Sequence, residues 1–212
     1  MNSKFNRLMA CISLTILVLA AGCKSSDMSP KTAGSAWNDN GEYDRAIALY
    51  SGEIEQKPGN ADAYFNRGFV YSLKGEARQA IEDYDTAIQL KPDYVIAYEN
   101  RGTAFYALGQ YDQAVDDYTK AIELNPKDPI AFKNRGTAYH QMGQFQDAIK
   151  DYTSAIALQS NYADAYENRA VSYCSLKDYD NAWADIAACR KHGGAPQSNF
   201  IALLTKESGR GQ

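Results

Sequence analysis

The sequence predicts an all-α solenoid of about five helix–turn–helix repeats, the first and last degenerate, with a C-terminal capping helix. Two observations support this prediction. Gly68, Gly102 and Gly136 lie 34 residues apart, and the residues around them recur at the same interval. Each interval also carries two apolar stripes of helical spacing, separated by short breaks that contain glycine or proline. A fixed period of this length is typical of a stacked repeat array, in which neighbouring repeats bury a continuous core.

The second repeat illustrates how each helix pair is specified. Asn60 precedes the first apolar stripe, so we expect a helix over 61–73 with the Asn60 side chain as its N-cap. Gly75 ends this helix, and the next stripe predicts a second helix over 77–90. Pro92 follows, and it stops the second helix because proline cannot continue helical hydrogen bonding.

The recurring residues resemble the tetratricopeptide repeat (TPR) family. Its pattern is an aromatic, a glycine, an aromatic, two alanines, an aromatic and a closing proline at set offsets. Segments 61–94, 95–128 and 129–162 follow this pattern nearly throughout, although the third has Ser160 where proline is expected, whereas 163–196 follows it in part. In that last segment the glycine, the second-helix aromatic and the proline are replaced by Ala170, Ile186 and Gly194. The resemblance implies a TPR solenoid, and the stretch before residue 60 resembles a degenerate first repeat.

The chain divides into four predicted segments. They are a lipoprotein signal peptide at 1–22, a lipidated flexible tether at 23–36, the TPR array at 37–196, and a capping helix and tail at 197–212. In the last segment we expect Ser198 to cap a short helix. Its apolar residues Phe200, Leu203 and Leu204 are expected to cover the open end of the array.

The N-terminal residues indicate a targeting segment. Lys4 and Arg7 precede an uncharged run over 8–21, which is too short for an ordinary membrane span. The small residues before Cys23 resemble the lipobox of bacterial lipoproteins, which implies lipid attachment at Cys23. Lys24 stands where an aspartate commonly retains lipoproteins in the inner membrane, so the resemblance implies the outer membrane, facing the periplasm. The alternative is a plain secretory peptide or an uncleaved anchor, with Cys23 incidental.

Four arginines precede the glycine position, and an aspartate follows each of them sixteen residues later. The predicted pairs are Arg67–Asp83, Arg101–Asp117, Arg135–Asp151 and Arg169–Asp185. The degenerate first repeat lacks both partners, since it has Ala33 and Leu49 at these positions. This joint loss favours an ion pair between the two helices of a repeat. The alternative is a row of arginines for anionic ligands.

The family resemblance implies a concave groove lined by the first helix of each repeat. The sixth position of that helix is an asparagine in four repeats: Asn66, Asn100, Asn134 and Asn168. A side-chain amide both donates and accepts, so this ladder can hold a peptide backbone of any sequence. Alternatively, the asparagines bond neighbouring turns and keep the repeats in register. The other candidate groove residues are Phe65, Phe69, Tyr106, Lys133 and His140.

Composition argues against several function classes. The formal net charge is −4 with no long basic run, which disfavours nucleic acid as a partner. Neither histidine has further ligands at metal-binding spacing, and no nucleophile–base arrangement is evident, so we expect no metal, no cofactor and no catalytic residues. The sixteen tyrosines fall on packing positions of the repeat. An enzyme or carbohydrate binder that used these rings would need them exposed.

The sequence therefore predicts a non-enzymatic adaptor that binds other envelope proteins in its groove and contacts the membrane only through its N-terminal lipid. The alternative is a self-assembling structural scaffold that acts through the ends of the array. Both interpretations are compatible with a homo-oligomer.

Overall fold

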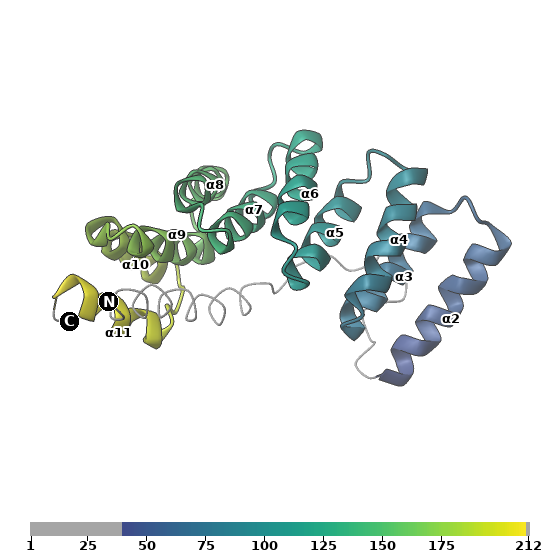
Figure 1. Cartoon of the computed structure of the whole chain (residues 1–212), viewed down its shortest axis with the longest axis horizontal. Helices are drawn as coiled ribbons and strands as arrows, with labels where there is room; N and C mark the ends of the chain where they lie inside the picture. Colours follow the sequence, from purple (N-terminus) through teal and green to yellow (C-terminus); the bar gives the residue numbers. More distant parts are fainter. Residues whose placement is uncertain (1–39, 211–212) are drawn as a thin grey trace, which may run out of the picture. The chain divides into compact units, whose positions relative to one another are not determined.

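The structure is a computed structural model of the chain that describes residues 40–210. Within these residues it contains ten α-helices and no strand (Figure 1), which confirms the predicted fold class. The signal segment, Cys23, the tether and the first helix of the degenerate repeat fall outside the described residues.

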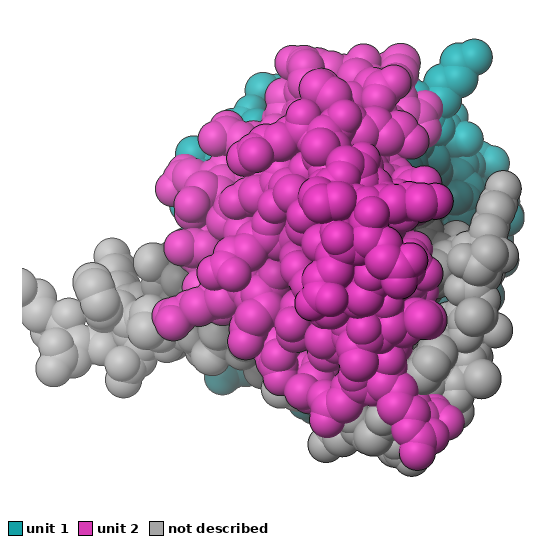
Figure 2. All heavy atoms as spheres, turned by 90° about the vertical axis from the view of Figure 1, so that its right-hand side faces the viewer, with its two compact units in different colours: residues 1–24, 127–212 teal, residues 25–126 magenta. Residues whose placement is uncertain are grey.

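The chain forms two compact units (Figure 2). Among the described residues, unit 2 covers 40–126 and unit 1 covers 127–210. The helices of unit 2 are α2 (Asn40–Gln56), α3 (Ala61–Lys74), α4 (Ala77–Leu90), α5 (Val95–Ala107) and α6 (Tyr111–Leu124). Those of unit 1 are α7 (Pro129–Gln141), α8 (Phe145–Leu158), α9 (Ala163–Ser175), α10 (Tyr179–Lys191) and α11 (Ser198–Ser208).

The predicted bounds of the second repeat agree with α3 and α4 to within one residue. Gly75 ends α3 in a left-handed conformation with φ of 82°, which glycine adopts without steric cost. Asn60 stands at the N-cap position, but its side chain makes no capping hydrogen bond, so that part of the prediction was wrong. The backbone replaces the side chain here: the Ala63 N–H donates to the Asn60 carbonyl at 3.1 Å, and the Asn60 N–H donates to Lys57 O at 3.0 Å.

The glycine of each full repeat makes room for the tyrosine of its second helix. A Cβ atom at Gly102 would lie 3.0 Å from Cε1 of Tyr118, closer than side-chain carbons normally approach. The ring reaches past the glycine, and its hydroxyl lies 3.0 Å from Thr103 Oγ1. Tyr152 makes the same contact with Thr137 at 3.2 Å. The hydroxyl of Tyr84 instead lies 3.2 Å from Ser72 Oγ, three residues further along the first helix, because Phe69 occupies the threonine position there. These tyrosines are buried, so they belong to the core.

The last repeat lacks both the glycine and the tyrosine of this contact. Ile186 takes the place of the tyrosine, so the methyl group of Ala170 is accommodated where the other repeats require glycine. Val171 occupies the position that is Phe69, Thr103 or Thr137 in the other repeats. Ala170, Val171 and Ile186 are all buried in one apolar cluster. The replacements of glycine by Ala170 and of tyrosine by Ile186 are therefore one coupled packing change.

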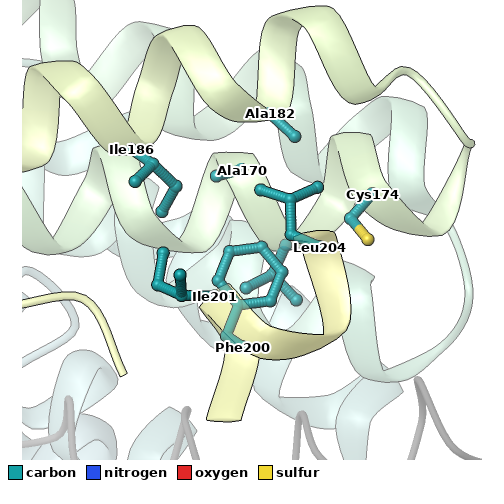
Figure 3. Close-up of a cluster of buried hydrophobic side chains, with 8 residues drawn as sticks. Ala170, Cys174, Ala182, Ile186, Phe200, Ile201 and Leu204 are labelled. Carbon is teal, nitrogen blue, oxygen red and sulfur yellow. The ribbon is translucent and has the colours of Figure 1, made fainter. Parts of the chain in front are cut away.

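The C-terminal helix α11 completes this cluster (Figure 3). Phe200, Ile201 and Leu204 point from α11 toward the side chains of α9 and α10 and are buried against them. The sequence prediction named Leu203 as the third apolar residue, but Leu203 is only partly buried and Ile201 takes its place.

Polar contacts also hold α11 and its linker in place. The Gln197 N–H donates to Oε1 of Glu167 at 2.9 Å, and Trp183 Nε1–H donates to Ser208 Oγ at 3.1 Å. Gln197, and not Ser198, occupies the N-cap position, and it makes no side-chain capping bond. The helix is thus positioned by its apolar face and by α9 and α10, without the predicted serine cap.

Candidate functional site

The candidate site is the face formed by the first helices of the repeats, here called the first-helix face. In unit 2 it belongs to α3 and α5, and in unit 1 to α7 and α9. The predicted asparagine ladder contributes two residues to each unit.

The asparagine amides differ in whether they already have a partner. Asn100 Nδ2 donates to the carbonyl of Ile96 at 2.8 Å, one turn earlier in α5. The side chains of Asn66, Asn134 and Asn168 form no hydrogen bond within residues 40–210. Asn168 is unusual among them because only 7% of it is exposed. Three of the four amides can therefore donate to and accept from a bound molecule, and one is partly committed to its own helix.

Aromatic side chains define the face in unit 2. Phe65 is buried, and its ring centroid lies 5.8 Å from that of Tyr84 and 5.1 Å from that of Tyr94. Phe69 stacks on Phe65 at 6.4 Å and is only partly buried. Phe65 is thus a core residue that supports Phe69, and Phe69 is the ring that this face presents. Tyr106, also partly buried, lies 5.3 Å from the ring of Tyr111.

In unit 1 the predicted polar residues lie deeper than a solvent-lined groove would suggest. Lys133 is only 5% exposed, and its carbonyl accepts a hydrogen bond from Thr137 Oγ1 at 2.9 Å. His140 is also 5% exposed, and its ring centroid lies 5.0 Å from that of Phe145. Burial lowers the pKa of His140 to about 4, so the ring is neutral at neutral pH.

His140 has a partner that the sequence prediction did not include. Its Nδ1 lies 2.8 Å from Oγ of Ser172 on α9, and Ser172 Oγ–H donates to the Asn168 carbonyl at 3.2 Å. A sequence signal for Ser172 did exist. The same repeat position is apolar in the other repeats, where it is Val70, Ala104 and Ala138.

The four predicted Arg–Asp pairs are present, each with two hydrogen bonds. The Nε and Nη2 groups of Arg67, Arg101, Arg135 and Arg169 donate to Asp83, Asp117, Asp151 and Asp185 at 2.6–2.9 Å. Nη1 of three of them reaches back to the preceding second helix, where it meets Ser51, Asp85 or Thr153. Arg67, Arg101 and Arg169 thus each join three helices, and all four arginines already bind an aspartate, which makes them structural rather than a site for anions.

Aromatic rings cover the same guanidinium groups. Arg101 Cζ lies 5.6 Å from the ring centroid of Tyr98 and 5.9 Å from that of Phe105. Such cation–π contacts add to the ion pair and restrict the guanidinium to one orientation. The arginine side chains therefore hold neighbouring helices in register.

Comparisons with known proteins identify the family. Residues 34–75, 71–109 and 102–143 match the model described as TPR repeat, and residues 129–162 match the model described as tetratricopeptide repeat. The chain belongs to the tetratricopeptide repeat family. TPR arrays generally serve as non-enzymatic scaffolds for protein interactions.

Solved structures share the fold. MamA is 25% identical with a TM-score of 0.70, and the match covers 72% of this chain and 90% of MamA. YrrB, a TPR protein with an unusual peptide-binding site, is 21% identical with a TM-score of 0.67, over 93% of this chain and 90% of YrrB. PilF of Pseudomonas aeruginosa is 19% identical with a TM-score of 0.68, over 97% of this chain and 86% of PilF. No curated protein matches the chain.

None of the helices within residues 40–210 is long and apolar enough to cross a membrane. In the same range, no group of three or more histidine, cysteine, aspartate or glutamate side chains is placed to hold a metal ion.

Proposed function

We propose that the chain is a non-enzymatic adaptor that binds an extended peptide or a partner helix of another envelope protein on its first-helix face. The observation that carries this proposal is the state of the asparagine amides. Asn66, Asn134 and Asn168 keep their side-chain donors and acceptors unused within the described residues. If the ladder served only to hold neighbouring turns, all four amides would be bonded as Asn100 is.

The acidic excess of unit 2 favours a partner with basic residues. Residues 40–126 carry fifteen acidic and eight basic side chains, whereas residues 127–210 carry nine acidic and ten basic ones. The basic residues of α3 and α5 are already paired, since Arg67 and Arg101 bind aspartates and Lys74 binds Asp44 and Glu76. We expect the part of a partner that meets unit 2 to offer basic residues and an apolar side chain for Phe69.

The similar structures are consistent with this function. YrrB, which shares the fold over most of its length, is a TPR protein with a peptide-binding site. The self-assembly alternative would use an exposed apolar end of the array. It receives no support from α11, whose apolar side chains are buried against the chain's own α9 and α10.

The test is a crosslinking pull-down from intact cells. We expect the variant with Asn66, Asn134 and Asn168 all replaced by alanine to lose its partner, because each lost hydrogen bond removes about 0.5–1.5 kcal/mol. The matched control replaces Asn125, Asn161 and Asn199, which are exposed and lie outside the first helices. Circular dichroism establishes that both variants fold. Equal capture by the two variants would show that the ladder does not bind the partner.

The adaptor is proposed to be lipid-anchored at Cys23 and to face the periplasm from the outer membrane. This part of the proposal rests on the sequence pattern around Cys23 and Lys24. Metabolic labelling with a fatty-acid probe tests it. We expect Cys23→Ser to abolish incorporation of the probe and Cys11→Ser to leave it unchanged, since Cys11 lies in the segment predicted to be removed. Labelling that survives Cys23→Ser would exclude an anchor at this residue.

A further inference from the structure

We propose that His140 is a fixed hydrogen-bond acceptor on the first-helix face of unit 1, and that it selects a peptide with an N–H or O–H donor opposite its Nε2 atom. The proposal rests on the proposed function, because it assigns a specificity to the same peptide-binding face. One hydrogen-bonded chain, His140–Ser172–Asn168, supports the proposal.

The contacts of Ser172 suggest a tautomer for the His140 ring. A serine hydroxyl has one hydrogen, and the carbonyl of Asn168, one turn earlier in α9, lies 3.2 Å from Ser172 Oγ and can only accept. We infer that the hydrogen is donated to this carbonyl, so that the ring is the donor in the 2.8 Å contact between His140 Nδ1 and Ser172 Oγ. With the hydrogen on Nδ1 of a neutral imidazole, Nε2 carries a lone pair.

This lone pair has no partner among the residues that the structure describes. Nε2 forms no hydrogen bond within residues 40–210, although His140 is only 5% exposed. Among residues 40–210, Thr205 Oγ1 is the only side-chain nitrogen or oxygen that lacks a hydrogen-bond partner and has almost no solvent-accessible surface. Nε2 of His140 also lacks a partner but does not belong to this group, so it keeps some solvent-accessible surface. An acceptor that is largely desolvated and still unpaired favours a ligand that supplies the missing donor.

Two asparagine side chains on these helices form no hydrogen bond within residues 40–210. Asn134 lies six residues before His140 on α7, a rise of about 9 Å along the helix. Asn168 lies one turn before Ser172 on α9 and is itself nine-tenths buried.

The arrangement defines what the peptide must carry. An asparagine amide pairs with either a donor or an acceptor, so Asn134 and Asn168 tolerate any backbone register. The acceptor on His140 is different, since it requires an N–H or a hydroxyl and repels a carbonyl or carboxylate oxygen. His140 thereby requires a donor, and so excludes the nitrogen of a proline, at the point of the peptide that it faces.

A peptide-display experiment tests the proposal on the full chain. Random displayed peptides are selected on the native protein, and one selected peptide is synthesised with each backbone N–H methylated in turn. We expect methylation at one position to weaken binding about three- to tenfold, which corresponds to one lost hydrogen bond. For the His140→Phe variant, which keeps a ring against Phe145, the same methylation should have no further effect.

Nitrogen NMR supplies an independent readout, because the chain has two histidines, His140 and His192. We expect the native His140 ring to carry its hydrogen on Nδ1, and Ser172→Ala to raise the share of the other tautomer. Hydrogen on Nε2 in the native protein would overturn the inference, whether or not the variants fold.

The binding data separate this inference from the proposed function. If Asn134→Ala weakens the selected peptide while His140→Phe and the methylated peptides do not, the His140 inference is wrong and the peptide-binding face stands. If neither Asn134→Ala nor His140→Phe changes the affinity, both are wrong.

Discussion

Replacing Arg101 with alanine is expected to lower the free energy of unfolding by about 3–5 kcal/mol, which is the usual effect of leaving a buried charge unpaired. Arg101 donates to Asp117 at 2.8 and 2.6 Å and to Asp85 at 2.5 Å. Asp117 is only 4% exposed, and burial raises its pKa even with Arg101 in place. Without the arginine, α4, α5 and α6 would lose the side chain that connects them. Urea denaturation followed by circular dichroism measures the loss.

Two variants control the Arg101 experiment. Arg78→Ala removes an exposed arginine from α4 of the same unit and should change stability by less than about 0.5 kcal/mol. Arg101→Met combined with Asp117→Leu removes both members of the buried pair, and it should recover most of the lost stability. If Arg101→Ala were as stable as Arg78→Ala, the arginines would not join the helices as described.

Replacing Phe200 with alanine is expected to cost about 3–5 kcal/mol, since it removes a buried aromatic ring from the cluster that α11 forms with α9 and α10. The loss should expose Val171 and Ile186, which α11 covers in the native protein. Thermal denaturation measures it, and increased binding of a hydrophobic dye would report the uncovered surface.

A matched pair of aliphatic residues on α11 provides the control. Ile201→Ala should cost about 2–5 kcal/mol because Ile201 is buried in the cluster. Leu203→Ala, on the partly buried side of the same helix, should cost clearly less. Equal effects of the two substitutions would contradict the observed orientation of α11.

The fold could be predicted from sequence because its determinants are local and repeated. Glycine at the left-handed turn at Gly75 and Pro92 after the second helix allow the bounds of α3 and α4 to be predicted to within one residue. Which face of α11 meets the array was less determined. Residues 200–204 are all apolar, so periodicity could not distinguish Ile201 from Leu203, and the angle at which α11 packs on α9 decides between them.

The candidate site was predictable only as a set of positions. Repeat spacing identified the asparagine ladder, but whether an amide is free depends on its rotamer, and Asn100 turns back to Ile96. Spacing also placed Phe65 and Phe69 together, although Phe65 packs inward against Tyr84 and Tyr94. The partner of His140 lies 32 residues away in the next repeat, where only the replacement of an apolar residue by Ser172 indicated a polar contact.

Site-specific photocrosslinking in intact cells tests most directly whether the first-helix face binds the partner. A benzophenone amino acid replaces Phe69, the partly exposed ring of that face, and in a second strain replaces Gln89, an exposed residue of the second helix α4. We predict that the Phe69 position captures a discrete protein partner and that the Gln89 position does not. Capture from Gln89 alone would place the interaction on the second helices and contradict the proposed function.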